Sequence, residues 1–104
     1  MSYRLRPAHD YKDLLAAGAQ VVDVRAPSEF ARGSTDEAVN IPVEDLYLRL
    51  KELDRDRCVV LLGNTGEERP VRAAVLLRAC FFPNVVVLVG GLRALQGLPS
   101  LLAA

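Results

Sequence analysis

The stretch from residue 59 to residue 72, VVLLGNTGEERPVR, most constrains the fold of this 104-residue chain. Its four apolar residues, VVLL, are typical of a short strand that is covered on both faces of a sheet. The turn formers GNTG follow, and Pro70 suits the first turn of a helix, where a missing N–H is harmless. In parallel α/β sheets, ligands bind where the carboxyl end of a strand leads into a helix, because free N–H groups face that point. The sequence therefore places a candidate site at residues 63–69, within a stretch that has no Cys, Ser or His.

Apolar runs and turn formers alternate along the rest of the chain. Strands that alternate with helices indicate a parallel sheet with right-handed crossovers. We therefore predict an α/β fold, a small doubly wound five-stranded parallel sheet with helices on both faces, over residues 1–97, followed by a tail at 98–104. Strands are expected at residues 3–6, 19–24, 38–41, 58–62 and 85–89, and helical segments at 7–17, 27–32, 43–53, 70–80 and 92–96.

Composition narrows the classes of function. Thirteen basic residues balance thirteen acidic ones, so neither nucleic acid nor a membrane surface is expected as a partner. The chain shows no apolar stretch of membrane-spanning length and no signal peptide, which predicts a cytoplasmic location. Two cysteines, Cys58 and Cys80, set no disulfide framework. A single histidine without a Cys/His cluster predicts no metal site, and we expect no cofactor.

Four short motifs occur in order along the chain. They are VVDVR at residues 21–25, EFARG at 29–33, AVNIP at 38–42 and VVVLVGG at 85–91. In order and separation they resemble the DVR strand, the EF with the glycine of GHIPGA, the A-x-N-I-P segment and the closing V-x-x-L-x-G-G of the rhodanese family. The resemblance covers residues 3–96 and implies one rhodanese-like domain with the α/β fold described above.

The resemblance also implies an activity and the position on which it depends. A rhodanese carries a cysteine directly after its fourth strand. The thiolate takes a sulfur atom from a donor such as thiosulfate, holds it as a persulfide and passes it to an acceptor. The matching position here is Gly63, which has no side chain to form a persulfide. Ser34 stands where the family has histidine, and Glu67 and Glu68 stand near a cationic or hydroxyl position. The sequence therefore predicts a rhodanese-like domain without persulfide catalysis, which acts in binding or regulation toward a protein partner or a small anion.

One alternative is a thiosulfate-type sulfurtransferase that uses another cysteine. Cys58 begins the strand at the end opposite the loop, and four strand residues span roughly 13 Å. Cys80 closes the following helix, roughly 15 Å from the start of that helix. Both positions favour buried apolar roles, because free cysteine is commonly buried.

A second alternative is a phosphate- or oxyanion-binding module. Backbone N–H groups of the loop form an anion-binding nest in this hypothesis, and the spacing from Gly63 to Arg69 is similar to that of the phosphatase relatives of rhodaneses. Two glutamates in the same loop oppose an anion by like charge. Asp23 and Arg25 end the second strand on the ligand side and are expected to pair with each other or with loop backbone. The candidate residues are Gly63, Asn64, Thr65, Gly66, Glu67, Glu68 and Arg69 in the loop, with Asp23, Arg25 and Arg72 as support.

Overall fold

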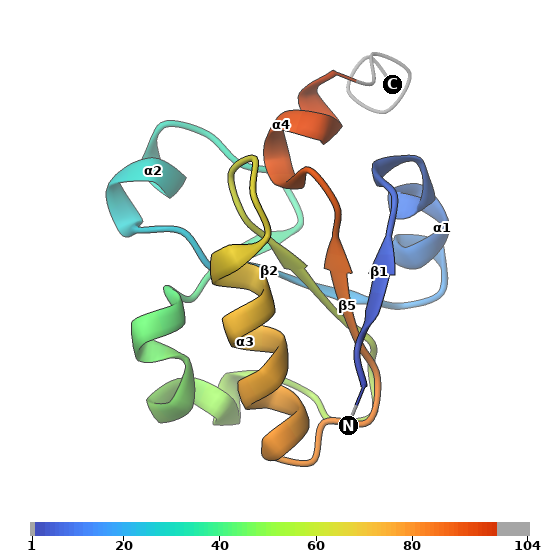
Figure 1. Cartoon of the computed structure of the whole chain (residues 1–104), viewed down its shortest axis with the longest axis vertical. Coiled ribbons are helices and arrows are strands. Elements are labelled where there is room, and N and C mark those ends of the chain that lie inside the picture. Colours follow the sequence, from blue (N-terminus) through green and yellow to red (C-terminus); the bar gives the residue numbers. More distant parts are fainter. Residues whose placement is uncertain (1, 98–104) are drawn as a thin grey trace.

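Five strands, all parallel, form one sheet in the order β1-β5-β4-β2-β3 (Figure 1). The computed structural model describes residues 2–97, so the predicted tail at 98–104 lies outside the described residues. The parallel sheet with helices confirms the predicted fold class. The strands are β1 (Arg4–Arg6), β2 (Gln20–Asp23), β3 (Ala38–Asn40), β4 (Val59–Leu62) and β5 (Val85–Leu88).

The helical segments lie between the strands, as the alternating pattern predicts. They are η1 (Ala8–Asp10), α1 (Tyr11–Ala16), α2 (Pro27–Ala31), η2 (Val43–Glu52), α3 (Glu68–Ala79) and α4 (Gly91–Gln96). The segment expected at 43–53 is a 3-10 helix with non-helical dihedral angles at Arg49, rather than one regular α-helix. Helix α3 begins at Glu68, two residues before the predicted start, so Pro70 lies in its first turn, where its missing N–H removes no helical hydrogen bond.

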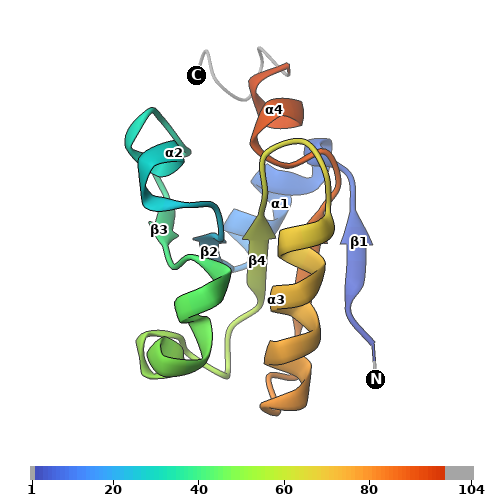
Figure 2. The ribbon, with the colours of Figure 1, turned by 60° about the vertical axis from the view of Figure 1, so that its left-hand side comes forward.

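Two apolar cores lie on the two faces of the sheet. Side chains alternate between the faces along each strand, so Leu61 and Val87 face one core while Val60 and Val86 face the other. Helix α3 and η2 cover the first face, and α1 and α4 pack against the second. Figure 2 shows α3 in front of β4, with α1 behind the sheet. Because both faces of the central strands are covered, every residue in the apolar runs at 59–62 and 85–88 lies in one of the two cores.

The central strands β4 and β5 are buried at every residue. Neither is an edge strand, since β1 and β3 take those places. The strand expected at 85–89 ends one residue earlier, and Val89 is 40% exposed. Their complete burial over residues 59–62 and 85–88 is what continuous apolar runs require, since such runs need cover on both faces of the sheet.

The carboxyl ends of the parallel strands meet at one edge of the sheet, which lies toward the top of Figure 1. The loop from β4 to α3, helix α2 and helix α4 gather there. None of the helices in residues 2–97 has the length and apolar character that a membrane span requires. The same residues contain no group of three or more His, Cys, Asp or Glu side chains placed to hold a metal ion.

Candidate functional site

The loop after β4 is fastened to the start of α4 through backbone hydrogen bonds. The carbonyl oxygen of Gly63 accepts the N–H of Leu92 at 2.9 Å, and that of Asn64 accepts the N–H of Arg93 at 3.1 Å. Gly91 permits this approach, because its φ is +56° and a Cβ there would lie 2.4 Å from the Gly63 oxygen. The loop is therefore held in one position by the neighbouring strand–helix turn.

The two glutamates of the loop point to different places. One carboxylate oxygen of Glu67 accepts the backbone N–H of Gly90 at 3.0 Å, which adds a further tie between the loop and the turn before α4. Glu68 lies in the first turn of α3, where the helix dipole favours a negative charge. Both glutamates were expected to repel an anion bound at the loop. Only Glu68 lines the cleft beside the loop, so one of these two negative charges faces it.

Packing closes the position of Gly63, the residue that the sequence resemblance matches to the family's nucleophile. Gly63 is buried, and its backbone lies outside the left-handed region that only glycine adopts readily. A Cβ at this position would lie 2.8 Å from Cγ and 2.9 Å from Cδ of Pro70, and 3.0 Å from the carbonyl oxygen of Gly66. Carbon atoms in contact lie about 3.5–4.0 Å apart. The ring of Pro70 therefore occupies the space that a side chain at residue 63 would need.

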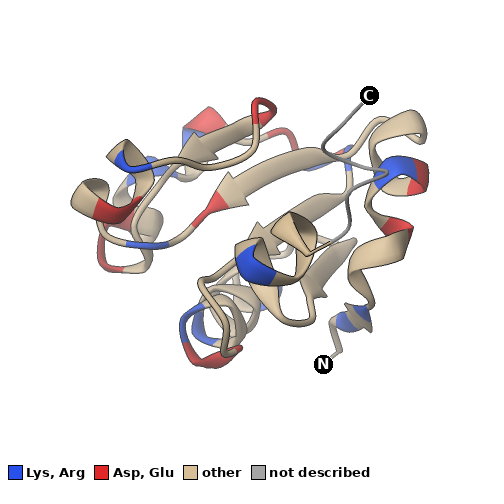
Figure 3. Ribbon diagram, turned by 90° about the horizontal axis from the view of Figure 1, so that it is seen from above, with Lys and Arg blue, Asp and Glu red and all other residues tan. Residues whose placement is uncertain are grey.

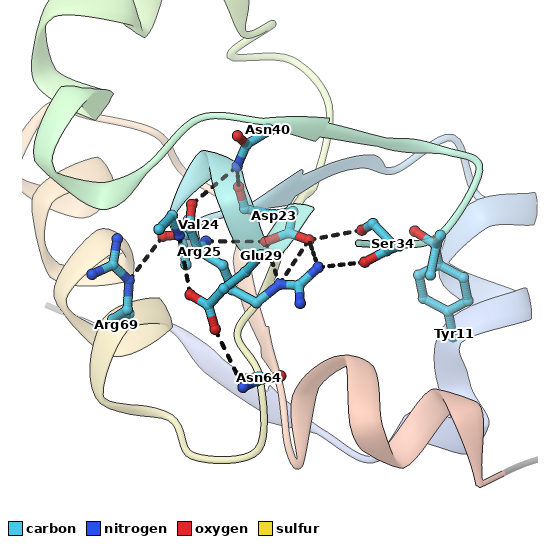
Figure 4. A network of polar contacts seen from close by, with 12 residues as sticks. Tyr11, Asp23, Val24, Arg25, Glu29, Ser34, Asn40, Asn64 and Arg69 are labelled. Atoms are coloured by element: carbon cyan, nitrogen blue, oxygen red, sulfur yellow. Dashed lines mark hydrogen bonds and ion pairs between the residues drawn. The ribbon is translucent and has the colours of Figure 1, made fainter. Parts of the chain in front are cut away.

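A buried ion pair organises the end of β2 (Figure 4). Asp23 is fully buried and Arg25 is 5% exposed. The guanidinium donates from Nη2 to Asp23 Oδ2 at 2.7 Å and to the carbonyl oxygen of Gly33 at 2.7 Å. Ser34 donates its hydroxyl to Asp23 Oδ2 at 2.7 Å, and the Asn40 amide donates to the backbone oxygens of both paired residues. The hydrogen bonds to Asp23 raise the pKa of Arg25, so the guanidinium stays charged.

Tyr11 supports the segment that follows α2. Its hydroxyl hydrogen-bonds to Glu37 at 2.8 Å and to Thr35 at 3.0 Å. Burial raises the pKa of Tyr11, with the Glu37 carboxylate adding to the effect, and the phenol stays neutral. The segment that carries Ser34 is thereby held against the sheet.

Arg69 and Arg72 lie one turn apart at the start of α3. Arg69 donates from Nε to the carbonyl oxygen of Val24 at 3.0 Å, and from its two Nη atoms to Glu44 at 2.9 and 2.7 Å. Its hydrogen bonds, with a smaller contribution from Arg72, hold the pKa of the Glu44 carboxyl below its usual range. Figure 4 shows the Arg69 side chain reaching toward Val24 at the end of β2.

A shallow cleft of about 340 Å³ lies between these groups. A smaller hollow of about 200 Å³ adjoins it and shares Arg25, Glu29 and Asn64 with it. Glu29 accepts from the Asn64 amide at 3.4 Å and from the backbone N–H of Ala26 at 3.3 Å. Seen from above the strand ends, basic and acidic segments are interspersed along the described residues (Figure 3). The cleft is lined by Arg25, Glu29, Gly63, Asn64, Gly66, Glu68, Arg69, Pro70 and Arg72.

Neither cysteine lines this cleft. Cys58 precedes β4 at the opposite edge of the sheet, in a separate cavity of about 550 Å³ that includes Arg4. Burial raises the pKa of the Cys58 thiol, and Arg4 offsets only part of the effect. Cys80 follows the last turn of α3 and is half-buried. Both thiols are thus separated from the loop by the length of an element.

Most of the sequence-predicted site residues come together at this edge, but they do not all face the cleft. Thr65 and Glu67 lie outside its lining, and Asp23 lies behind Arg25. Sequence reasoning missed Pro70 as the group that fills the nucleophile position. It also missed Glu44 as the partner of Arg69, because these residues are 25 positions apart and no local pattern joins them.

The fold agrees with what comparison with known proteins shows. Residues 7–98 match the family model of the rhodanese-like domain, and the chain belongs to this family. A sulfurtransferase from Allochromatium vinosum is 33% identical over 81 residues, which are 76% of this chain and 75% of that protein. A tRNA 2-selenouridine synthase from Shewanella sp. (strain MR-4) is 44% identical over 86 residues. Those residues are 83% of this chain and 20% of the synthase, so the chain spans about one fifth of that relative.

Solved structures show the same architecture. A rhodanese-related protein from Thermoplasma volcanium superposes with a TM-score of 0.81 at 30% identity, covering 91% of this chain and 92% of that one. A rhodanese-like domain from Anabaena gives a TM-score of 0.79 at 33% identity, covering 93% and 75%. The strand order and the position of the loop therefore belong to the family fold.

The buried ion pair at the end of β2 gives a stability prediction. Arg25→Ala leaves the Asp23 carboxylate buried without its cation, so we expect the free energy of unfolding to fall by about 3 kcal/mol. Arg49→Ala is the matched control, because it breaks an exposed Arg–Glu pair of similar geometry and is expected to change stability by less than about 1 kcal/mol. Urea unfolding of the two variants measures the difference. Equal losses would contradict the organising role given to the buried pair.

Proposed function

We propose that this rhodanese-like domain binds a ligand or partner at the strand ends and does not transfer sulfur. The observation that carries the proposal is the packing of Gly63. Persulfide chemistry needs a thiolate at that position, and the Pro70 ring takes the space in which even a Cβ would lie. The position without a thiol is thus one whose side-chain space the Pro70 ring already fills.

The alternative sulfurtransferase, which would use Cys58 or Cys80, has less support. Neither thiol lines the cleft, and burial raises the pKa of Cys58, which lowers its thiolate fraction at neutral pH. Free N–H groups that stabilise an anionic sulfur are found at the strand carboxyl ends, whereas Cys58 lies at the amino end of β4. We therefore assign both cysteines to packing.

The names of the relatives suggest the setting in which such a domain works. One is a sulfurtransferase and others are tRNA 2-selenouridine synthases, so we place this domain beside sulfur or selenium transfer, where it contacts the donor or carrier without holding the chalcogen itself. Balanced charge favours a protein partner or a small anion over nucleic acid. We place the domain in the cytoplasm on the same sequence grounds.

A thiosulfate–cyanide assay tests the proposal. We expect thiocyanate formation by the natural chain to stay at the uncatalysed background, with the Allochromatium vinosum relative, a named sulfurtransferase, as the positive control. Cys58→Ser and Cys80→Ser variants are assayed in parallel. Turnover of about 1 per second or faster that disappears in one of these variants would overturn the proposal in favour of the alternative sulfurtransferase.

The closed nucleophile position gives a second prediction. In a background that lacks Cys58 and Cys80, Gly63→Cys forces its Cβ against Pro70, and we expect unfolding free energy to fall by about 1–3 kcal/mol. Adding Pro70→Ala opens that space and should restore most of the loss. The thiol then lies near the start of α3, where the helix dipole lowers a thiol pKa. Alkylation at neutral pH should therefore be several-fold faster in the double variant.

Urea unfolding and the pH dependence of alkylation at residue 63 measure both effects. Pro70→Ala alone serves as the control for the loss of the ring. If Gly63→Cys proves as stable and as reactive without the Pro70 change as with it, the ring does not close the position.

A further inference from the structure

The Glu44 carboxylate already occupies the donor pair of one guanidinium group, that of Arg69. Both Nη atoms of Arg69 donate to it in a bidentate arrangement, at 2.9 and 2.7 Å. Arg72 adds attraction from one turn further along α3, without a hydrogen bond among the described residues. Arrangements of this kind match the paired oxygens of a carboxylate or of a tetrahedral oxyanion.

The Arg69 fork keeps its direction independently of Glu44. Its Nε donates to the carbonyl oxygen of Val24 at 3.0 Å, which ties the guanidinium to the end of β2. The two Nη atoms then face outward as a preformed pair of donors. An acceptor that replaces Glu44 therefore meets a fork that is already oriented, and less conformational freedom is lost on binding.

The contact with Glu44 is also exposed enough to exchange. The side chains of Arg69 and Glu44 are 33% and 54% exposed. Exposed ion pairs of this type are weak and are screened by salt. Because Arg69 holds the pKa of Glu44 low, its carboxylate is charged at neutral pH and competes with any incoming anion.

We propose that Arg69 and Arg72 form a carboxylate or oxyanion site, which Glu44 fills in the free domain and which a ligand enters by displacing it. The inference rests on the proposed binding function, because it names the chemistry that the cleft at the strand ends recognises. The site lies beside the 63–66 loop rather than within it, since the Nη atoms of Arg69 point toward Glu44 in η2.

The charges around the site set the expected affinity. Glu29 and Glu68 line the same cleft, and both oppose an anion. Arg25 does not compensate for them, because it is paired with Asp23. Small anions should therefore bind the natural chain weakly, and the affinity should rise when Glu44 loses its charge.

The test is a titration with sodium sulfate and, separately, sodium acetate, followed by chemical shifts of the backbone amides of residues 66–72 at low ionic strength. Glu44→Gln keeps the shape of the side chain and removes its charge. We expect the dissociation constant of at least one anion to fall by about tenfold, a change of about 1.4 kcal/mol. Glu52→Gln is the matched control, because Glu52 forms an equivalent exposed bidentate pair with Arg49 and should leave anion binding unchanged.

A second variant assigns the gain to the proposed site. Adding Arg72→Gln to Glu44→Gln should return the affinity to within about twofold of the natural chain. Tighter sulfate binding points to an oxyanion ligand, and tighter acetate binding points to the carboxylate of a partner; either supports the site. Unchanged affinity in Glu44→Gln, or a gain that survives Arg72→Gln, would overturn it. Sulfur transfer by the natural chain would instead overturn the proposed function, so the two failures are distinguishable.

Discussion

The close packing around Gly63 is the constraint on which this edge of the molecule depends. Its carbonyl oxygen receives the N–H of Leu92, and that contact exists because Gly91 has no side chain. On the other side, the Pro70 ring occupies the space that a Cβ at Gly63 would take. The end of β4 is therefore enclosed by the starts of two helices, α3 and α4. In the function proposed here, the residue that matches the nucleophile position of a rhodanese is part of the packed structure.

Most polar side chains around Gly63 form ion pairs or hydrogen bonds with neighbouring groups. Arg25 pairs with Asp23, Arg69 with Glu44, and Glu67 with the backbone of the turn before α4. Such pairs differ in strength, because Asp23 and Arg25 are buried whereas Glu44 and Arg69 are partly exposed. Buried pairs fix geometry and exposed pairs exchange readily. The buried Asp23–Arg25 pair therefore fixes this edge of the sheet, whereas the Arg69–Glu44 pair is the contact that a ligand can replace in the proposed site.

The sequence predicted the fold well because the central strands carry an unmistakable pattern. Four apolar residues in β4 and in β5 require cover on both faces, and turn formers mark where each strand ends. Val89 was assigned to β5 from its β-branched type, yet it lies beyond the covered part of the sheet. The residue at which a strand ends depends on which elements pack over the sheet, and the residue type alone does not reveal this.

The site was predicted in position and only partly in its contacts. The strand–loop–helix order places residues 63–69 at the edge where the carboxyl ends of the parallel strands meet, and the expected Asp23–Arg25 pair forms there. The closeness of Pro70 to Gly63 arises from the path of the loop between these two residues. The hydrogen bond from the Gly90 N–H to Glu67 joins residues 23 positions apart in the sequence. Contacts of this range are set by the fold as a whole, so a single sequence offers no local signal for them.

Intact mass measurement of the natural chain after exposure to thiosulfate tests the central claim most directly. A chain whose nucleophile position is closed gains no sulfur, so a single unmodified mass is predicted. An added sulfur atom that cyanide removes, located to Cys58 or Cys80 by peptide mapping, would contradict the account. It would show that this domain carries a persulfide by a route that its strand-end loop does not supply.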